Sequence, residues 1–231
     1  LRCLVGSEMC IRDRVNGGRI VYTDGDGREV KDYLDHIGYL PQNFDVFPEL
    51  TAYEVLQFFA NLKGYKITEA EITHLLEILN LSPQRDMTVK TLSGGMKRRL
   101  GIAQALIGDP DVLLLDEPTA GLDPEERLNF KNVIRRIKGD RCVVLSTHII
   151  TDIESLCDRI LVLCDGRITA FDSCGALADV ARGKVYAVES TADLATPFHS
   201  MGPVTVDGKA YEKIISKAPL AAPALEPTVE D

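Results

Sequence analysis

The residues whose types point most clearly to a chemical role follow two apolar segments that have the length of buried strands. The stretch VLLLDEPTAGLDP, residues 112–124, runs from an apolar segment directly into two adjacent carboxylates, Asp116 and Glu117. A second apolar run, CVVLST, ends at His148. Carboxylates at the carboxyl end of a buried parallel strand are typical of a site for a magnesium nucleotide. Such a site also needs backbone amides that hold the phosphates.

The segment TLSGGMKRRLGIAQAL offers one phosphate-binding element. Ser93 precedes the double glycine Gly94-Gly95 and a run of apolar residues at helical spacing, so Ser93 is suited to cap a helix. The glycines would let the first amides of that helix approach an anion, which the helix dipole also favours. A serine-capped turn without any ligand would have the same local sequence, so this segment does not decide the function alone.

Alternating strands and helices must position these residues. The pattern predicts strands at residues 20–22, 37–40, 112–115, 142–147 and 160–163, and helices at 52–64, 68–80, 96–107, 125–138 and 149–156. Strands separated by helices predict an α/β fold with a mostly parallel sheet. Ligands of such sheets bind beyond the carboxyl ends of the strands, where both carboxylates and the histidine would lie.

Four segments in a fixed order, GYLPQ, LSGGMKRRL, VLLLDEPTAGLD and STH, resemble the nucleotide-binding domain of ATP-binding cassette (ABC) proteins. The resemblance spans about residues 15–175. It implies a P-loop NTPase-like fold that binds ATP and Mg²⁺ and acts as an ATPase. It also implies a peripheral location on the cytoplasmic face of the cell membrane, with an integral-membrane permease as partner.

The resemblance implies a role for each polar residue at the predicted site. By position, Gln42 and Asp116 would support magnesium, Glu117 would polarise the attacking water, and His148 would lie beside the γ-phosphate. Phosphoryl transfer to water needs little more than such positioning and charge compensation. Each residue also has a plainer explanation, as a solvated strand end, an ordinary loop glutamine or a histidine that closes a strand. The order of the four segments argues against these explanations.

The remaining matched residues imply a second subunit. Ser93, Gly94 and Gly95 would bind the γ-phosphate of a nucleotide that the other subunit holds, and Asp123 would cross the interface between the subunits. The resemblance therefore implies a homodimer, or pairing with a second nucleotide-binding domain.

The loop G-x-x-x-x-G-K-[ST], which the family uses to hold phosphates, does not occur in the sequence. The segment LRCLVGSEMCIRDR, residues 1–14, precedes the matched region, keeps no sustained apolar period and resembles a translated sequencing adapter. We therefore expect residues 1–14 to be non-native and to form no element of the fold. We also expect the domain to be incomplete at its N-terminus, because it has lost this phosphate-binding loop, which is called the Walker A loop. The chain as printed should then bind ATP poorly and hydrolyse essentially none.

These observations predict three regions: residues 1–14, an ABC ATP-binding domain at 15–183 with a helical subdomain at about 43–92, and a truncated β-rich appendage at 184–231. The complete gene product would be an ATP-hydrolysing subunit that drives a permease. Export is favoured over import because the stretch LPQNFDVFPELTAYE and the C-terminal tail are similar to exporter-type members that serve drugs, antibiotics or lipids. The aromatic-rich segment 44–64 would carry the permease contact, with some of its aromatic residues partly exposed.

Two other functions remain open, a soluble cassette ATPase that acts on ribosomes or DNA and a non-catalytic partner subunit. The net charge of −9 disfavours nucleic acid as a partner. Intact Glu117, Gly95 and His148 disfavour a subunit without catalysis. The six cysteines include no C-x-x-C pair and the four histidines do not cluster with them, so no structural zinc site is expected.

Overall fold

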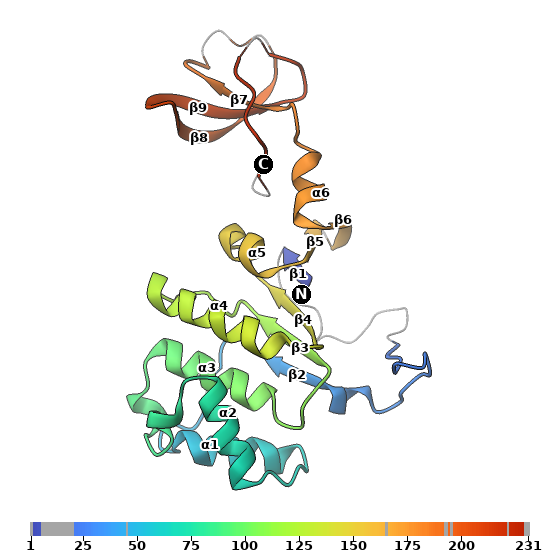
Figure 1. The fold of residues 1–231 in the computed structure, drawn as a ribbon, viewed down its shortest axis with the longest axis vertical. Helices are drawn as coiled ribbons and strands as arrows, with labels where there is room; N and C mark the ends of the chain where they lie inside the picture. Colours follow the sequence, from blue (N-terminus) through green and yellow to red (C-terminus); the bar gives the residue numbers. More distant parts are fainter. Residues whose placement is uncertain are drawn as a thin grey trace.

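A computed structural model describes the backbone of residues 2–5 and the ranges 21–44, 46–164, 166–191, 194, 196–220 and 222–228. Within these ranges the chain forms a central sheet, a cluster of helices at one end of that sheet and a smaller sheet at the other end (Figure 1). None of the described helices has both the length and the apolar character that a membrane crossing requires.

The central sheet confirms the predicted α/β fold. Its strands are β1 (Arg2–Val5), β2 (Ile37–Leu40), β3 (Val112–Asp116), β4 (Cys142–Ser146), β5 (Arg159–Cys164) and β6 (Arg167–Asp172). They lie in the order β2-β3-β4-β1-β5-β6. The first five are parallel, and β6 pairs with β5 in the antiparallel direction.

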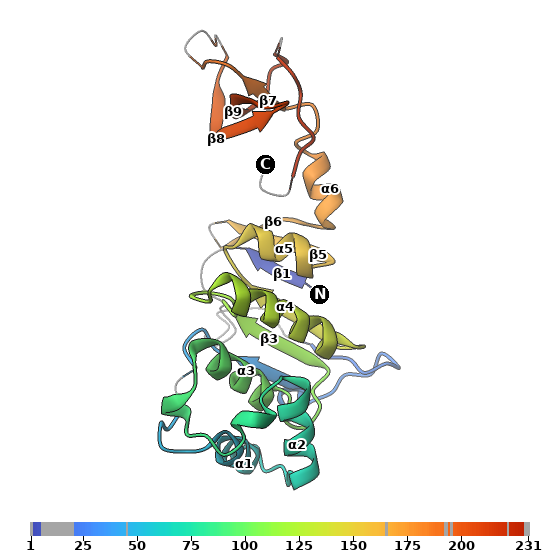
Figure 2. The same cartoon turned by 60° about the vertical axis from the view of Figure 1, so that its left-hand side comes forward.

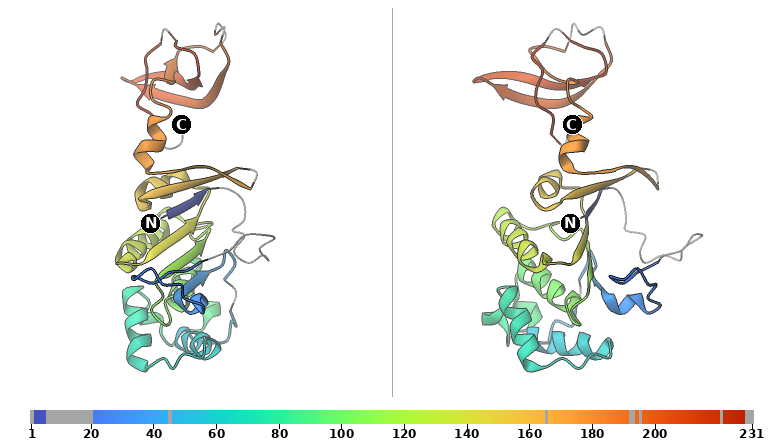
Figure 3. Two further views of the ribbon diagram at one scale, coloured as in Figure 1. Left: turned by 90° about the vertical axis from the view of Figure 1, so that its right-hand side faces the viewer. Right: turned by 45° about the vertical axis from the view of Figure 1, so that its right-hand side comes forward.

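The described helices are α1 (Ala52–Leu62), α2 (Glu69–Ile78), α3 (Gly94–Ala105), α4 (Pro124–Lys138), α5 (Ile150–Leu156) and α6 (Cys174–Asp179), with the short 3-10 helices η1 (Tyr33–His36), η2 (Ser82–Gln84) and η3 (Val89–Thr91). Five of them, α1 to α5, begin and end close to their predicted positions, whereas α6 and the 3-10 helices were not predicted. Capping boxes at Thr51 and Thr68 explain where α1 and α2 begin. Helices α3, α4 and α5 lie against one face of the central sheet (Figure 3).

The prediction that residues 1–14 form no element of the fold is wrong at Arg2–Val5. This segment, β1, lies between β4 and β5, and its register places Leu4 opposite Ser146. Four residues are too few to show a period, and their pairing with distant strands leaves no local signal. Residues 6–20 are outside the described part of the chain. The strand predicted at 20–22 is also wrong in its described part, because Val21 and Tyr22 belong to no strand.

Helix α3 packs directly on β2 because two glycines allow it. A Cβ atom on Gly38 would lie 2.0 Å from the carbonyl oxygen of Ala105, and a Cβ atom on Gly101 would lie 2.5 Å from Leu40 Cδ1. Gln104 of the same helix donates a hydrogen bond of 2.7 Å to the carbonyl oxygen of Tyr39. The close contact fixes the N-terminus of α3 beside the loop that follows β2.

A second, antiparallel sheet lies beyond α6, at the end of the molecule away from α1 to α3 (Figure 2). It consists of β7 (Val185–Val188), β8 (Phe198–Val206) and β9 (Lys209–Ser216) in the order β7-β9-β8. Tyr186, Val188 and Ile214 form its small core. The C-terminal tail pairs with β7 through hydrogen bonds from Ala187 N to Pro223 O and from Leu225 N to Val185 O.

Candidate active site

The carboxyl ends of β3 and β4 place Asp116 beside Ser146. The parallel register pairs these two residues, and Ser146 Oγ donates a hydrogen bond of 2.6 Å to Asp116 Oδ1. Ser146 Oγ also accepts the backbone N–H of Glu117 at 3.0 Å, and the Ser146 carbonyl oxygen accepts the same N–H at 3.1 Å. Ser146 is buried, so this one residue holds both carboxylate residues from the neighbouring strand.

Glu117 and His148 form the second polar contact of the site. His148 Nδ1 lies 2.9 Å from Glu117 Oε1, and the imidazole is largely exposed while the carboxylate is largely buried. Glu117 has a φ of 44°, a left-handed conformation that costs roughly 1–3 kcal/mol and persists only where neighbours hold it. Its hydrogen bonds to Ser146 provide that support. The buried Glu117 Oε2 has no hydrogen-bond partner within the described protein, so it can accept a hydrogen bond from a water or ligand.

The loop after β2 lies against the N-terminal half of α3 through Arg98. Its Nη1 atom donates hydrogen bonds to the carbonyl oxygens of Pro41, at 3.4 Å, and Gln42, at 2.5 Å. Burial lowers the pKa of the Arg98 guanidinium, while the charges of Asp116 and Glu117 oppose this shift. Arg98 thus contacts the Gln42 backbone and lies within the electrostatic reach of both carboxylates.

Ser93, Gly94 and Gly95 lie at the first turn of α3. Ser93 is the helix cap that its sequence predicts, since its Oγ accepts the backbone N–H of Met96 at 3.1 Å. Gly94 is exposed and lines a pocket of about 210 Å³ together with Gln42 and the turn at residues 120–122. Gly95 is buried against α4.

Asp123 is the N-cap of α4, with Pro124 at the first helical position. Its Oδ1 accepts the backbone N–H of Glu126 at 2.8 Å. The structure therefore places the predicted site residues in two groups. Asp116, Glu117 and His148 are joined, directly or through Ser146, at the sheet edge. The second group lies around the loop after β2 and the N-termini of α3 and α4, and its members are Gln42, Ser93, Gly94, Gly95 and Asp123.

Sequence reasoning missed two residues of the site, Ser146 and Arg98. Ser146 lies inside the quoted STH segment, but its contact with Asp116 depends on the cross-strand register, which local sequence does not specify. Arg98 is the third residue after Gly95 and reads as a solvated helix position. Its contact with the Gln42 loop follows from the close packing of α3 on β2, which the small residue Gly101 could have suggested.

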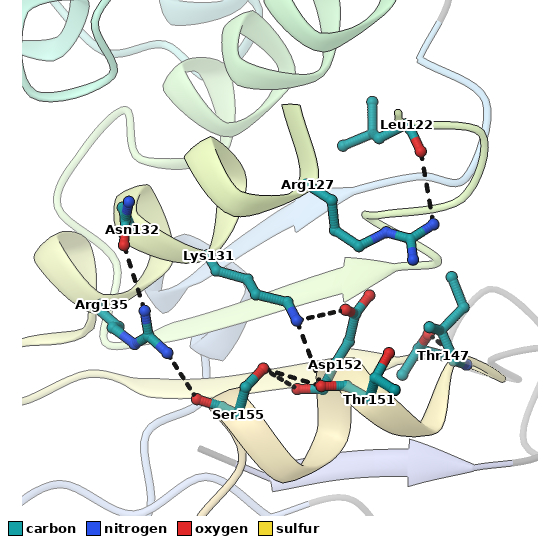
Figure 4. A network of polar contacts seen from close by, with 10 residues as sticks. Leu122, Arg127, Lys131, Asn132, Arg135, Thr147, Thr151, Asp152 and Ser155 are labelled. Carbon is teal, nitrogen blue, oxygen red and sulfur yellow. Dashed lines mark hydrogen bonds and ion pairs between the residues drawn. The ribbon is translucent and has the colours of Figure 1, made fainter. Parts of the chain in front are cut away.

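Helix α5, which follows His148, is held in place by basic residues of α4 (Figure 4). These residues are spaced along one face of α4. Their contacts are Lys131 with Asp152 and the Thr151 carbonyl, Arg135 with the Ser155 carbonyl, and Lys138 with Asp158. The pair of Lys131 Nζ and Asp152 Oδ1, at 2.8 Å, is the buried one, since the Asp152 side chain is only 1% exposed.

Replacing Lys131 by methionine is expected to lower the free energy of unfolding by about 3–5 kcal/mol, because Asp152 would remain as an uncompensated buried charge. The double substitution Lys131→Met with Asp152→Leu should recover most of this loss. Lys138→Met is the matched control, since its ion pair is more exposed and worth under about 1 kcal/mol. Denaturant unfolding of the three variants measures the difference. Equal, small losses for Lys131→Met and Lys138→Met would show that the buried pair has no special role.

The oxygen donors of the site fit a magnesium nucleotide better than a metal held by protein alone. Among the described residues, no group of three or more His, Cys, Asp or Glu side chains could hold a metal ion. Mg²⁺ commonly takes one or two protein oxygens together with phosphates and waters. Asp116, oriented by Ser146, could supply one of these oxygens, and Gln42, which lines the pocket beside the N-terminus of α3, is the residue that the resemblance implies for a second. When bound, the ion would neutralise charge on the phosphates.

Comparison with known proteins decides the family. The family model described as ABC transporter matches residues 1–120 of this chain. The chain belongs to the ABC transporter family. The predicted resemblance to an ABC nucleotide-binding domain is therefore confirmed, and nucleotide binding follows for the ABC domain of this chain.

The relatives of the ABC domain include long mammalian proteins and a shorter bacterial protein. The "ABC-type organic anion transporter ABCA8B" of Mus musculus is 38% identical over 69% of this chain and 10% of its own length. The "Phospholipid-transporting ATPase ABCA3" of Mus musculus is 42% identical over 57% of this chain and 8% of its own length. The "Uncharacterized ABC transporter ATP-binding protein YhcH" of Bacillus subtilis (strain 168) is 37% identical over 61% of this chain and 47% of its own length. The chain thus spans less than half of each of these relatives.

Proposed function

We propose that this ABC domain belongs to a subunit that binds and hydrolyses ATP with Mg²⁺ and thereby drives an integral-membrane permease, in the direction of export. The observation that carries the proposal is the group of Asp116, Glu117 and His148, which Ser146 organises at the carboxyl edge of a parallel sheet. Hydrolysis of a phosphoanhydride needs one carboxylate at the metal and a second at the attacking water. We assign these two roles to Asp116 and Glu117.

In this proposal the two carboxylate oxygens of Glu117 have different roles in general-base catalysis. Oε1 is oriented by His148 at 2.9 Å, and buried Oε2 remains able to accept a proton from water. Asp116 accepts a hydrogen bond from Ser146 Oγ, which fixes the orientation of its carboxylate. We therefore assign Asp116 to the metal rather than to the water. His148, whose side chain is 74% exposed, can reach a γ-phosphate that arrives from solvent.

The functional unit in this proposal is a head-to-tail dimer, with a second copy or a paired nucleotide-binding domain. Ser93 and Gly94 are exposed at the N-terminus of α3, where free amides and the helix dipole attract an anion. Within the chain, this turn packs against α4 while Glu117 contacts β4 and His148. A two-fold related partner would bring each such turn to the other subunit's Glu117, with Asp123 at the junction.

The domain division that accompanies this proposal extends the predicted ABC domain at residues 15–183 to include strand β1 (Arg2–Val5), which pairs inside the central sheet, and keeps a β-rich appendage at 184–231. Helices α1 and α2 fall between Gln42 and Ser93, which supports a helical subdomain at about residues 43–92. The separate core of the second sheet supports an appendage. The subunit would attach to the cytoplasmic face of the membrane through its permease.

An aromatic cluster beside the Gln42 loop supports a permease contact, and its members are Phe44, Phe47, Phe58 and Phe59. Phe47 is 58% exposed and its ring meets that of Phe58 edge-on, with centroids 5.5 Å apart. Phe58 and Phe59 also meet edge-on, and Phe44 lies 5.9 Å from Phe59. The cluster follows the Gln42 loop, whose backbone accepts a hydrogen bond from Arg98. A partner bound to the aromatic cluster would therefore contact the segment next to the candidate site.

A cysteine at position 47, introduced as Phe47→Cys, is expected to crosslink to the permease in membranes that contain the complex. Leu128→Cys on α4 is the matched control, because Leu128 is an equally exposed apolar residue, at 57%, on another element. Bifunctional thiol reagents followed by mass spectrometry identify the partner. Equal labelling of a membrane protein from both positions would contradict the contact. Crosslinks to ribosomal proteins alone would favour the soluble ATPase instead.

A further inference from the structure

Helices α3 and α4 are joined at their N-terminal halves by an ion pair that lies largely inside the protein. Arg99 Nη1 of α3 and Glu126 Oε2 of α4 are 3.0 Å apart. Their side chains are only 8% and 24% exposed. The free energy needed to desolvate two buried charges offsets most of their attraction, so the pair contributes little net stability. Its importance lies instead in how it positions the two helices.

The same carboxylate lies over the first turn of α3. A Cβ atom on Gly95 would stand 2.2 Å from Glu126 Oε2 and 2.4 Å from its Cδ, a separation that real atoms do not adopt. Glycine at position 95 therefore leaves the space that Glu126 occupies, in addition to any role toward a phosphate. Glu126 could not reach Arg99 along this path if residue 95 carried a side chain.

Through its backbone, Glu126 also contacts Asp123. The N–H of Glu126 donates to Asp123 Oδ1 at 2.8 Å, which completes the cap of α4. One residue thus connects the Gly95 turn, through its side chain, with the Asp123 turn, through its main chain. These two turns carry the four residues that would face a partner subunit.

We propose that Glu126 is a positioning residue that keeps the Ser93–Gly95 turn and the Asp123 turn in one fixed arrangement, so that both reach a partner subunit together. The inference rests on the proposed function, because the arrangement matters only if a second subunit uses these turns. In this proposal Glu126 does not act on the nucleotide or on the attacking water. Its effect passes through Gly95, Arg99 and Asp123.

Hydrogen exchange of the 231-residue chain tests the connection without any ATP hydrolysis. Glu126→Gln should speed exchange about tenfold at the amides of Met96 and Lys97 on α3, and also at those of Glu126 and Arg127 on α4. Glu125→Gln is the control, since Glu125 occupies the same turn of α4 with an exposed side chain and should change neither helix. Faster exchange on α4 alone, or on neither helix, would overturn the proposal. Arg99→Lys, which keeps the charge, should show a smaller effect on the same amides.

ATP turnover of a subunit that carries a phosphate loop tests the consequence. Glu126→Gln should lower kcat about tenfold with little change in KM for ATP, as expected for turns that are misplaced by a small distance. An increase in KM for ATP with an unchanged kcat would contradict a positioning role. If the unsubstituted subunit hydrolysed no ATP, the proposed function would fail, while the exchange experiment would still decide the role of Glu126.

Discussion

Glu117→Gln is expected to lower ATP turnover by a factor of about 10²–10⁴ while nucleotide remains bound. The amide keeps the size and shape of the carboxylate, so the left-handed turn and its hydrogen bonds to Ser146 should survive. It cannot accept a proton from water, which is the step assigned to the unpartnered Oε2. The 231 residues contain no G-x-x-x-x-G-K-[ST], so the turnover is measured on a subunit that carries this loop.

Retention of nucleotide separates this role from a structural one. Bound ATP and a dimer trapped in the closed state should both be detected in the Glu117→Gln protein, for example by size-exclusion chromatography with nucleotide. Glu125→Gln on α4 is the control for the loss of a carboxylate outside the site. If binding and turnover fell by the same factor, Glu117 would hold the site together rather than act on water.

Gly94→Asp is expected to abolish both ATP-driven dimerisation and turnover, with little effect on the stability of the isolated subunit. A Cβ atom on Gly94 would meet nothing within 4 Å, and a carboxylate in the first turn of a helix is favourable. In the proposed dimer, however, that carboxylate would face the γ-phosphate of the partner's nucleotide. The two anions repel each other in a site from which water is largely excluded.

Gly95→Asp would be a poorer test of the same idea. Its side chain would collide with the Glu126 side chain of the same chain, so a loss of activity could come from a displaced Glu126 rather than from the partner's phosphate. Gly94→Ala serves as the matched control for Gly94→Asp, since it adds a side chain without charge. Thermal unfolding of the isolated chain checks that the fold is kept. A Gly94→Asp subunit that dimerised and hydrolysed ATP normally would contradict a role for this turn in a partner's site.

The sequence was sufficient to predict helices α1 to α5 because their signals are local. Thr51 with Glu54 and Thr68 with Glu71 form capping boxes that fix where α1 and α2 begin, and the apolar spacing does the rest. The strands β3, β4 and β5 were equally clear, since each is an apolar run between turns. Strand β1 was missed because only its pairing with β4 and β5 reveals it.

The chemistry of the site was predictable by residue type, but its internal contacts were not. Asp116, Glu117 and His148 meet as expected at the ends of parallel strands. The serine that contacts the Asp116 carboxylate and the Glu117 backbone lies 30 residues from Asp116 in the chain, and the ion pair of Arg99 and Glu126 spans 27 residues. Contacts of this kind depend on register and helix packing, which local patterns do not determine. Glu117 has a left-handed backbone conformation, which residues other than glycine seldom adopt. Such exceptions to local preference are common at functional sites.

The most direct measurement is the ATP turnover of mixed subunits that both carry a phosphate loop. One subunit carries Gly94→Asp and the other carries Glu117→Gln, and each variant alone should be nearly inactive. If the sites are shared, a mixed dimer gathers both lesions in one site and leaves the other site intact. Random assembly makes half of the dimers mixed, so about a quarter of the unmodified turnover should return. Turnover that stays at the level of the separate variants would show that each chain completes its own site, and would contradict the account.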